Sequence, residues 1–276
     1  MGLGTMFKAN KAYRAQQKGN EGEAMRLYEE CFGEGLVDPR YLLSYAVLLI
    51  RDGQYQKAKD LLVKHQKAPG MTADQRVTLI VDYAACCYRL GDLDKAVSKL
   101  EEMFRKHPNG LIYQTLGYLY VEQYDASRQA AFLAKATEEQ EPADPAAVMI
   151  AREQGEEVPL TPEEKWEAGR QKTLKFNQDG VEYDDEDPVC LDNLAQTWYR
   201  VMGDREAAKP FFEKALALKP GQIDTLYFLS RYDLEAGNTA AAIEKMEKML
   251  EGRFSALNYC DRASVEAELK ALKDNH

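Results

Sequence analysis

Small and large apolar residues recur along the chain in a fixed relation to glycine. Five glycines are each followed five positions later by alanine and nine positions later by a large apolar residue. The sets are Gly19, Ala24 and Tyr28; Gly53, Ala58 and Leu62; Gly91, Ala96 and Leu100; Gly203, Ala208 and Phe212; and Gly237, Ala242 and Met246. Residues four apart lie on one face of a helix. The pattern therefore predicts a turn at each glycine and a second helix after it.

The first helix of each predicted hairpin carries a small residue where the two helices cross. Ala12, Ala46 and Ala84 stand seven positions before three of the turn glycines, and small residues allow helices to approach closely. The spacing is 34 residues from Gly19 to Gly53 and again from Gly203 to Gly237. One hairpin cannot bury its apolar face alone, so the pattern predicts a stack of hairpins that shares one continuous core.

With these residues, and with Pro108 and Pro220 near repeat ends, the chain resembles the tetratricopeptide-repeat (TPR) family. The resemblance implies an all-α fold: a right-handed α-α superhelix, or solenoid, of about seven helical hairpins. A last helix from about Arg262 to Lys273 is predicted to cap it. The resemblance also implies a scaffold for protein interactions, with the first helix of each repeat lining a concave groove.

The best-known groove of that family, a carboxylate clamp for chaperone C-termini, needs lysine, asparagine and arginine side chains at set positions. The corresponding positions here hold other residue types, namely Ala9, Tyr13, Ser44, Thr78 and Asp82. Binding of chaperone tails is therefore not expected.

The middle of the chain is less regular. The 112 residues between Gly91 and Gly203 fit either three periods plus ten residues or two periods plus a 44-residue insertion. We favour three periods, with Tyr124-Asp125 as a turn that lacks glycine and a helix from there to about Gln140. An irregular fifth unit then begins at 144–154, and its second helix runs from Thr161-Pro162 to about Gly180.

This reading divides one continuous solenoid into three parts. Residues 1–110 form N-terminal TPR-like repeats, 111–187 form irregular central repeats with an acidic extension, and 188–276 form C-terminal repeats with the cap. Residues 125–165 contain four basic and ten acidic side chains. We interpret this segment as a well-solvated bulge, and docking of a basic partner is the alternative.

Charge and cysteine content narrow the partners and the compartment. The chain has 36 Lys and Arg against 46 Asp and Glu, a net charge of −10, which disfavours nucleic acid and anionic membranes. The five cysteines form no CxxC pair, so a reducing, cytoplasmic location is expected. The first residues lack a basic segment leading into a long apolar one, and no run of about 18 apolar residues occurs, so the protein is expected to be neither exported nor membrane-spanning.

No catalytic motif is recognisable. The three histidines, His65, His107 and His276, are not paired with a nucleophile by local spacing, and the run 182–187 lacks the pattern of a calcium loop. We therefore expect neither an enzyme nor a bound metal or cofactor.

The groove is the predicted functional surface. Helical periodicity on the first helices of the repeats selects as groove residues Arg51, Tyr88, Arg89, Tyr118, Asn193, Arg200, Tyr227 and Arg231. The same periodicity places further residues on this surface: Val47, Ile50, Asp82, Ala85, Gln114, Val121, Thr197 and Phe228. Guanidinium groups bind carboxylates and tyrosine offers rigid contact area, so the predicted ligand is an acidic or aromatic peptide or protein segment.

Two alternatives remain. The same arginines and tyrosines are also ordinary residues for a half-exposed helix face. The array could instead be a self-associating structural or assembly protein, a homodimer for example, or a regulatory subunit without a peptide ligand.

Overall fold

The computed structural model describes residues 2–139, 154 and 158–274. Within these ranges the chain is all-α: it forms helices and turns, and no residue is in a strand. No helix in the described part is both long and apolar enough to cross a membrane. The contacts between Cα atoms divide the chain into two compact units. Unit 1 comprises residues 1–119 and 246–276, and unit 2 comprises residues 120–245.

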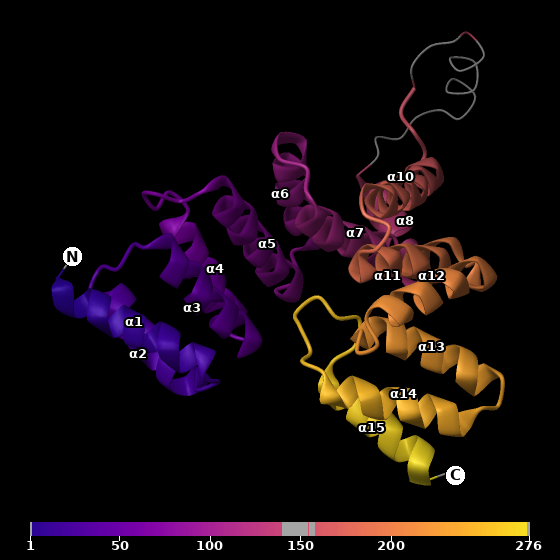
Figure 1. The fold of residues 1–276 in the computed structure, drawn as a ribbon. Helices are drawn as coiled ribbons and strands as arrows, with labels where there is room; N and C mark the ends of the chain where they lie inside the picture. The colour runs from indigo at the N-terminus through magenta and orange to yellow at the C-terminus, as the bar shows by residue number, and fades with distance from the viewer. Residues whose placement is uncertain (1, 140–153, 155–157, 275–276) are drawn as a thin grey trace. The chain divides into compact units, whose positions relative to one another are not determined.

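Unit 1 is built from helical hairpins (Figure 1). Its helices are α1 (Leu3–Gln17), α2 (Glu21–Gly33), α3 (Pro39–Arg51), α4 (Tyr55–His65), α5 (Ala73–Arg89), α6 (Leu93–Lys106) and α15 (Arg262–Asp274). Successive pairs pack together, α1 on α2, α3 on α4 and α5 on α6. Two further helices, α7 (Gly110–Tyr124) and α14 (Thr239–Glu251), contain the unit boundaries.

The predicted turn glycines are confirmed. Gly19, Gly53, Gly91, Gly203 and Gly237 have φ between 76° and 84°, the left-handed region that favours glycine. In the second hairpin the Gly53 N–H donates to the Ile50 carbonyl over 3.1 Å. This bond satisfies a carbonyl that the end of α3 leaves without an intrahelical partner.

The small residues of the repeat lie where the helices meet. The alanines five positions after the glycines, and the apolar residues four positions later, are all fully buried: Ala24, Ala58, Ala96, Ala208, Ala242, Tyr28, Leu62, Leu100, Phe212 and Met246. Ala12, Ala46 and Ala84 on the first helices are also fully buried. Any larger side chain there would separate the helices, because the interior is close-packed.

Unit 2 contains α8 (Gln129–Glu138), α10 (Pro162–Tyr183), α11 (Pro188–Gln196), α12 (Arg205–Leu218) and α13 (Ile223–Glu235). A short 3₁₀ helix (Ala126–Arg128) precedes α8, and a π-helical turn (Thr197–Met202) extends α11. The rings of Phe212 and Phe228 stack in its core with centroids 5.2 Å apart. Helix α10 packs on α8 and on α11.

The turn predicted at Tyr124-Asp125 is confirmed, and it differs from the glycine turns. Helix α7 ends at Tyr124, and Asp125 Oδ1 accepts a hydrogen bond of 2.8 Å from the Ser127 N–H. A carboxylate cap therefore replaces the left-handed glycine. The helix predicted from Thr161-Pro162 is present: Thr161 caps it in a capping box with Glu164, and it ends at Tyr183, three residues beyond the predicted Gly180. The predicted first helix of the fifth unit, 144–154, lies outside the described residues except for its last position.

Candidate functional site

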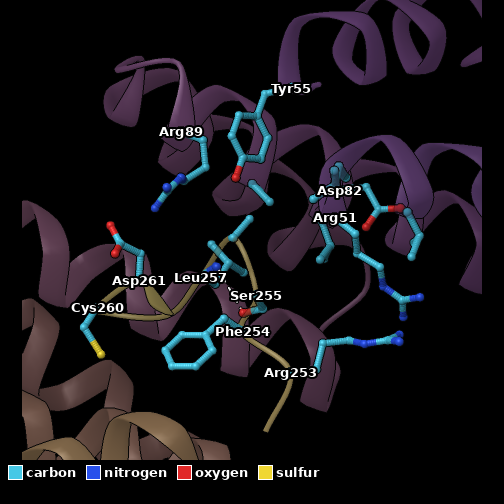
Figure 2. A pocket seen from close by; sticks show the side chains of 15 residues that line it. Arg51, Tyr55, Asp82, Arg89, Arg253, Phe254, Ser255, Leu257, Cys260 and Asp261 are labelled. Atoms are coloured by element: carbon cyan, nitrogen blue, oxygen red, sulfur yellow. Dashed lines mark hydrogen bonds between the residues drawn. The ribbon is translucent and has the colours of Figure 1, made fainter. Parts of the chain in front are cut away.

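Unit 1 contains a cavity of about 400 Å³ (Figure 2). One wall comes from the two first helices α3 and α5 and consists of Val47, Ile50, Arg51, Val81, Asp82, Ala85 and Arg89. We call this wall the α3–α5 face. The opposite wall is residues 253–261, the connection between α14 and α15, which we call the 253–261 segment.

Helical spacing brings the α3–α5 face together. Val47, Ile50 and Arg51 are three and four residues apart on α3, so they share one side of that helix. The other side of α3 is buried in the unit through Ala46, Leu48 and Leu49. The face is thus the part of each first helix that packing within the hairpins leaves uncovered.

The two arginines stand at helix ends. Arg51 is the last residue of α3 and Arg89 is the last residue of α5, where the helix dipole favours a cation. The Arg89 guanidinium carbon lies 5.6 Å from the centre of the Tyr55 ring, a cation–π contact. Figure 2 shows the Arg89 guanidinium and the Asp261 carboxylate directed toward one another. The pKa of Asp261 is below its usual range, chiefly because it accepts the Ser264 N–H, with a contribution from the charge of Arg89.

At the end of the cavity where Arg51 lies, Glu21 contacts both the α3–α5 face and the 253–261 segment. Its Oε1 atom is 3.3 Å from Arg51 Nη1 and 3.5 Å from Arg253 Nη1. Because one carboxylate faces two guanidinium groups, positive charge at this end exceeds negative charge.

Asp82 is the polar group without a partner in the cavity wall. Its Oδ2 atom is shielded from solvent and has no hydrogen-bond partner, although the side chain as a whole is only half-buried. Burial raises the pKa of the Asp82 carboxyl to about 7. A buried acceptor without a donor costs free energy, so a ligand that supplies an N–H or O–H group here gains a strong contact.

Four of the eight predicted groove residues lie in unit 1, and two of these four line the cavity. Arg51 and Arg89 line the cavity, but Tyr88 and Tyr118 do not. The Tyr88 and Tyr118 rings pack edge to face with centroids 5.9 Å apart, and their hydroxyl oxygens are 3.4 Å apart. Tyr118 is buried, so this pair serves packing within the unit.

In unit 2 the predicted groove residue Arg200 is already neutralised by internal carboxylates. It donates to Glu122 Oε1 over 2.6 Å and to Asp125 Oδ2 over 2.8 Å. Asn193 is buried as well. Tyr227 and Arg231 are half-buried and contact each other, with the Arg231 guanidinium carbon 4.3 Å from the Tyr227 ring centre. Burial therefore keeps Arg200 and Asn193 from contacting a ligand on the surface.

The 253–261 segment is the part of the site that sequence reasoning missed. The sequence predicts a last helix from about Arg262, and no motif assigns a role to the residues just before it. The length of this connection could have pointed to a functional role. It runs from Gly252 to Asp261, whereas other turns in unit 1 are as short as Asp52 to Gln54. Long connections in compact domains are often functional.

The structure also bears on two chemical predictions. None of the five cysteines, all of them in the described part of the chain, forms a disulfide, and four of them are buried. Among the described residues no group of three or more His, Cys, Asp or Glu side chains is arranged to hold a metal ion.

Solved structures resemble this arrangement closely enough to identify the fold. A thermophilic TPR protein of Thermus thermophilus, TTC0263, superposes with a TM-score of 0.59 at 16% identity over 86% of this chain and 99% of its own. The chain has the tetratricopeptide-repeat fold. No protein-family model and no curated protein sequence matches it.

Other structures with this tetratricopeptide-repeat arrangement have diverse descriptions. PilW, described as a type IV pilus biogenesis factor, has a TM-score of 0.57 at 12% identity over 91% of this chain and 94% of its own. A monomeric mutant of IFIT1 with Gppp-AAAA has a TM-score of 0.59 at 15% identity over 97% of this chain and 54% of its own. At these identities the likeness establishes the fold alone, and the ligand has to be argued from the residues of this chain.

Proposed function

We propose that the chain is a scaffold that binds a peptide or protein segment on the α3–α5 face of unit 1 and carries out no catalysis. The observation that carries the proposal is the unit 1 cavity, in which Asp82 Oδ2 has no partner and Arg51 and Arg89 stand at the helix ends. The tetratricopeptide-repeat fold, shared with other repeat scaffolds, supports the general role.

The chemistry of the wall suits a short extended peptide. Val47, Ile50 and Ala85 offer apolar contacts for one or two side chains, and a volume of about 400 Å³ accommodates a few residues. Asp82 accepts a backbone N–H or a hydroxyl group. The Arg89 guanidinium suits a carboxylate of the ligand, because its positive charge already contributes to lowering the pKa of the Asp261 carboxyl. The proposed ligand is therefore a peptide with an apolar or aromatic side chain and an acidic group.

A random peptide library displayed on phage provides ligands for a direct test. Enriched peptides are synthesised, and their affinity is measured by calorimetry for the wild type, for Arg89→Glu and for Arg76→Glu. Arg76 is exposed on the same helix and does not line the cavity, so it is the matched control. We expect Arg89→Glu to weaken binding at least about tenfold, the loss of one charge-assisted contact, and Arg76→Glu to change it little.

Two results would contradict this proposal. The first is an enriched peptide whose affinity is the same for all three proteins, because its site would then lie elsewhere. The second is the absence of any peptide that binds wild type.

A second candidate function, self-association, is favoured by the exposed apolar side chains of α1. Leu3 and Phe7 are 91% and 83% exposed and are four residues apart, so they share one face of the helix. If a second copy covers this face, sedimentation analysis of wild type gives the mass of a dimer, and Leu3→Glu with Phe7→Glu gives a monomer. A monomeric wild type would exclude this candidate.

A further inference from the structure

The 253–261 segment is an ordered turn held by its own hydrogen bonds. The Ser255 N–H donates to Asn258 Oδ1 over 2.7 Å, and the Leu257 N–H donates to Ser255 Oγ over 3.2 Å. At its end, Arg262 Nη2 donates to the carbonyls of Leu250 and Gly252 over 2.9 and 2.8 Å. These bonds restrict the conformations that the segment can adopt, which lowers the entropic cost of docking.

The segment presents to the α3–α5 face the groups that a peptide ligand would present. Arg253 pairs with Glu21 of α2, which also contacts Arg51 of the face, and Phe254 and Leu257 line the same cavity as Val47 and Ile50. Asp261 is directed toward Arg89 (Figure 2). A cation, an aromatic ring, an aliphatic side chain and a carboxylate therefore stand in order along one short segment.

The 253–261 segment fills only part of the space next to the α3–α5 face, and its contacts there are weak. A cavity of about 400 Å³ remains between the segment and the face, and no group of the segment reaches Asp82 Oδ2. The Arg253 side chain is 66% exposed, and an ion pair of an exposed side chain contributes little to stability. A better-fitting peptide can therefore compete with the segment, even though attachment to the chain raises the effective concentration of the segment.

We propose that the 253–261 segment is a built-in occupant of the α3–α5 face, and that the external partner is a peptide that displaces it. That partner carries the same order of groups: a basic residue, an aromatic residue next to it, an aliphatic residue three positions further on, and a carboxylate four positions beyond. This inference rests on the proposed function, because it names the ligand of that same face.

The test uses a fluorescent synthetic peptide with the sequence of residues 252–262 and Cys260→Ser to prevent disulfide formation. Its binding to full-length wild type is compared with its binding to full-length Phe254→Ala, Leu257→Ala, in which the internal segment has lost its apolar anchors. We expect the variant to bind the peptide at least about tenfold more tightly, since a face that is about 90% occupied shows a tenfold weaker apparent affinity. The same peptide with both anchors changed to alanine should bind neither protein, and Arg89→Glu in the variant should abolish binding.

A second measurement does not depend on the folding of the variant. Cys260 lines the cavity and is the only one of the five cysteines that is not buried. Its rate of reaction with a thiol reagent in wild type should increase several-fold when a phage-selected peptide is added. An unchanged rate at saturation would mean that the peptide does not displace the segment.

The outcomes separate this inference from the proposed function. If selected peptides bind with dependence on Arg89 but the 252–262 peptide binds both proteins equally or not at all, the inference is wrong and the proposed function stands. If no peptide binds at all, both are wrong. If wild type is a dimer that dissociates when peptide is added, the segment occupies the face of a second copy, which contradicts the built-in arrangement.

Discussion

The guanidinium of Arg200 donates a 2.6 Å hydrogen bond to the Glu122 carboxylate, and the two side chains are only 6% and 7% exposed. A second carboxylate, Asp125, accepts from Arg200 over 2.8 Å. The pair joins the π-helical turn after α11 to the last turn of α7 within unit 2. Because the Arg200 guanidinium is buried and paired with two carboxylates, we infer that its role is to stabilise the fold of unit 2.

Arg200→Leu should destabilise unit 2 strongly, because the buried Glu122 would keep only the exposed Arg128, 3.8 Å away, and Asp125 would lose the Arg200 guanidinium. The expected loss is about 3–5 kcal/mol, typical of removing one partner of a buried ion pair. Both tryptophans of the chain, Trp166 and Trp198, are in unit 2, so urea unfolding followed by tryptophan fluorescence measures this unit.

Arg128→Leu is the matched control for this prediction. Arg128 Nη2 is 3.8 Å from the other Glu122 oxygen, and its side chain is 49% exposed. Its removal should cost less than about 1 kcal/mol. Equal losses in the two variants would show that burial does not set the strength of the Arg200 contact.

Asp82→Asn should change how the stability of the protein depends on pH. The pKa of Asp82 is about 7 in the folded protein and near its ordinary value when unfolded, so the folded state binds more protons between about pH 4 and 7. Protonated Asp82 is therefore compatible with the folded state at low pH, and the free energy of unfolding decreases as the pH rises from about 4 to 7 and the carboxyl ionises. Asparagine cannot ionise, so the variant should be more stable than wild type by about 1–3 kcal/mol at pH 8 and should lose that advantage near pH 4.

Urea unfolding followed by circular dichroism at a series of pH values measures this difference. Asp60→Asn, which removes an exposed carboxylate from α4, should follow the wild-type profile. A constant difference between Asp82→Asn and wild type across the series would show that Asp82 does not titrate in this range.

Gly169→Ala should destabilise unit 2 although alanine favours helix. A Cβ atom at Gly169 would lie 1.9 Å from Tyr124 Cε1, and that ring is packed against Trp166 with centroids 5.4 Å apart. The ring must shift, so we expect a net loss of about 1–3 kcal/mol in the fluorescence-detected unfolding. Gly221→Ala, where a Cβ atom meets nothing within 4 Å, should be nearly neutral. If both substitutions are neutral, the Tyr124 ring is not held in place.

Local spacing was enough to predict the hairpins. Ala24, Ala58 and Ala96 are fully buried because a fixed offset from a left-handed glycine determines which side of the second helix meets the first. The same periodicity selected Val47, Ile50, Asp82 and Ala85, which line the cavity. It also selected Val121, Thr197 and Phe228, which are buried in the interior instead. Relations of this kind involve residues within one or two hairpins.

Contacts between distant parts of the chain could not be predicted in this way. Arg200 was selected as a groove residue, yet its carboxylate partners Glu122 and Asp125 lie 78 and 75 residues away, and no repeat pattern relates them. The Arg253 to Glu21 pair is still more remote in the sequence. Helical periodicity indicates which side chains leave a helix on a given face, but it does not indicate what covers that face.

Hydrogen–deuterium exchange of the wild type, with and without a saturating phage-selected peptide, tests the central claim most directly. We expect the peptide to slow exchange in the segments containing 47–51 and 81–89 and to accelerate it in 253–261, with little change in α12. Protection elsewhere, with unchanged exchange on the α3–α5 face and in the 253–261 segment, would contradict the account.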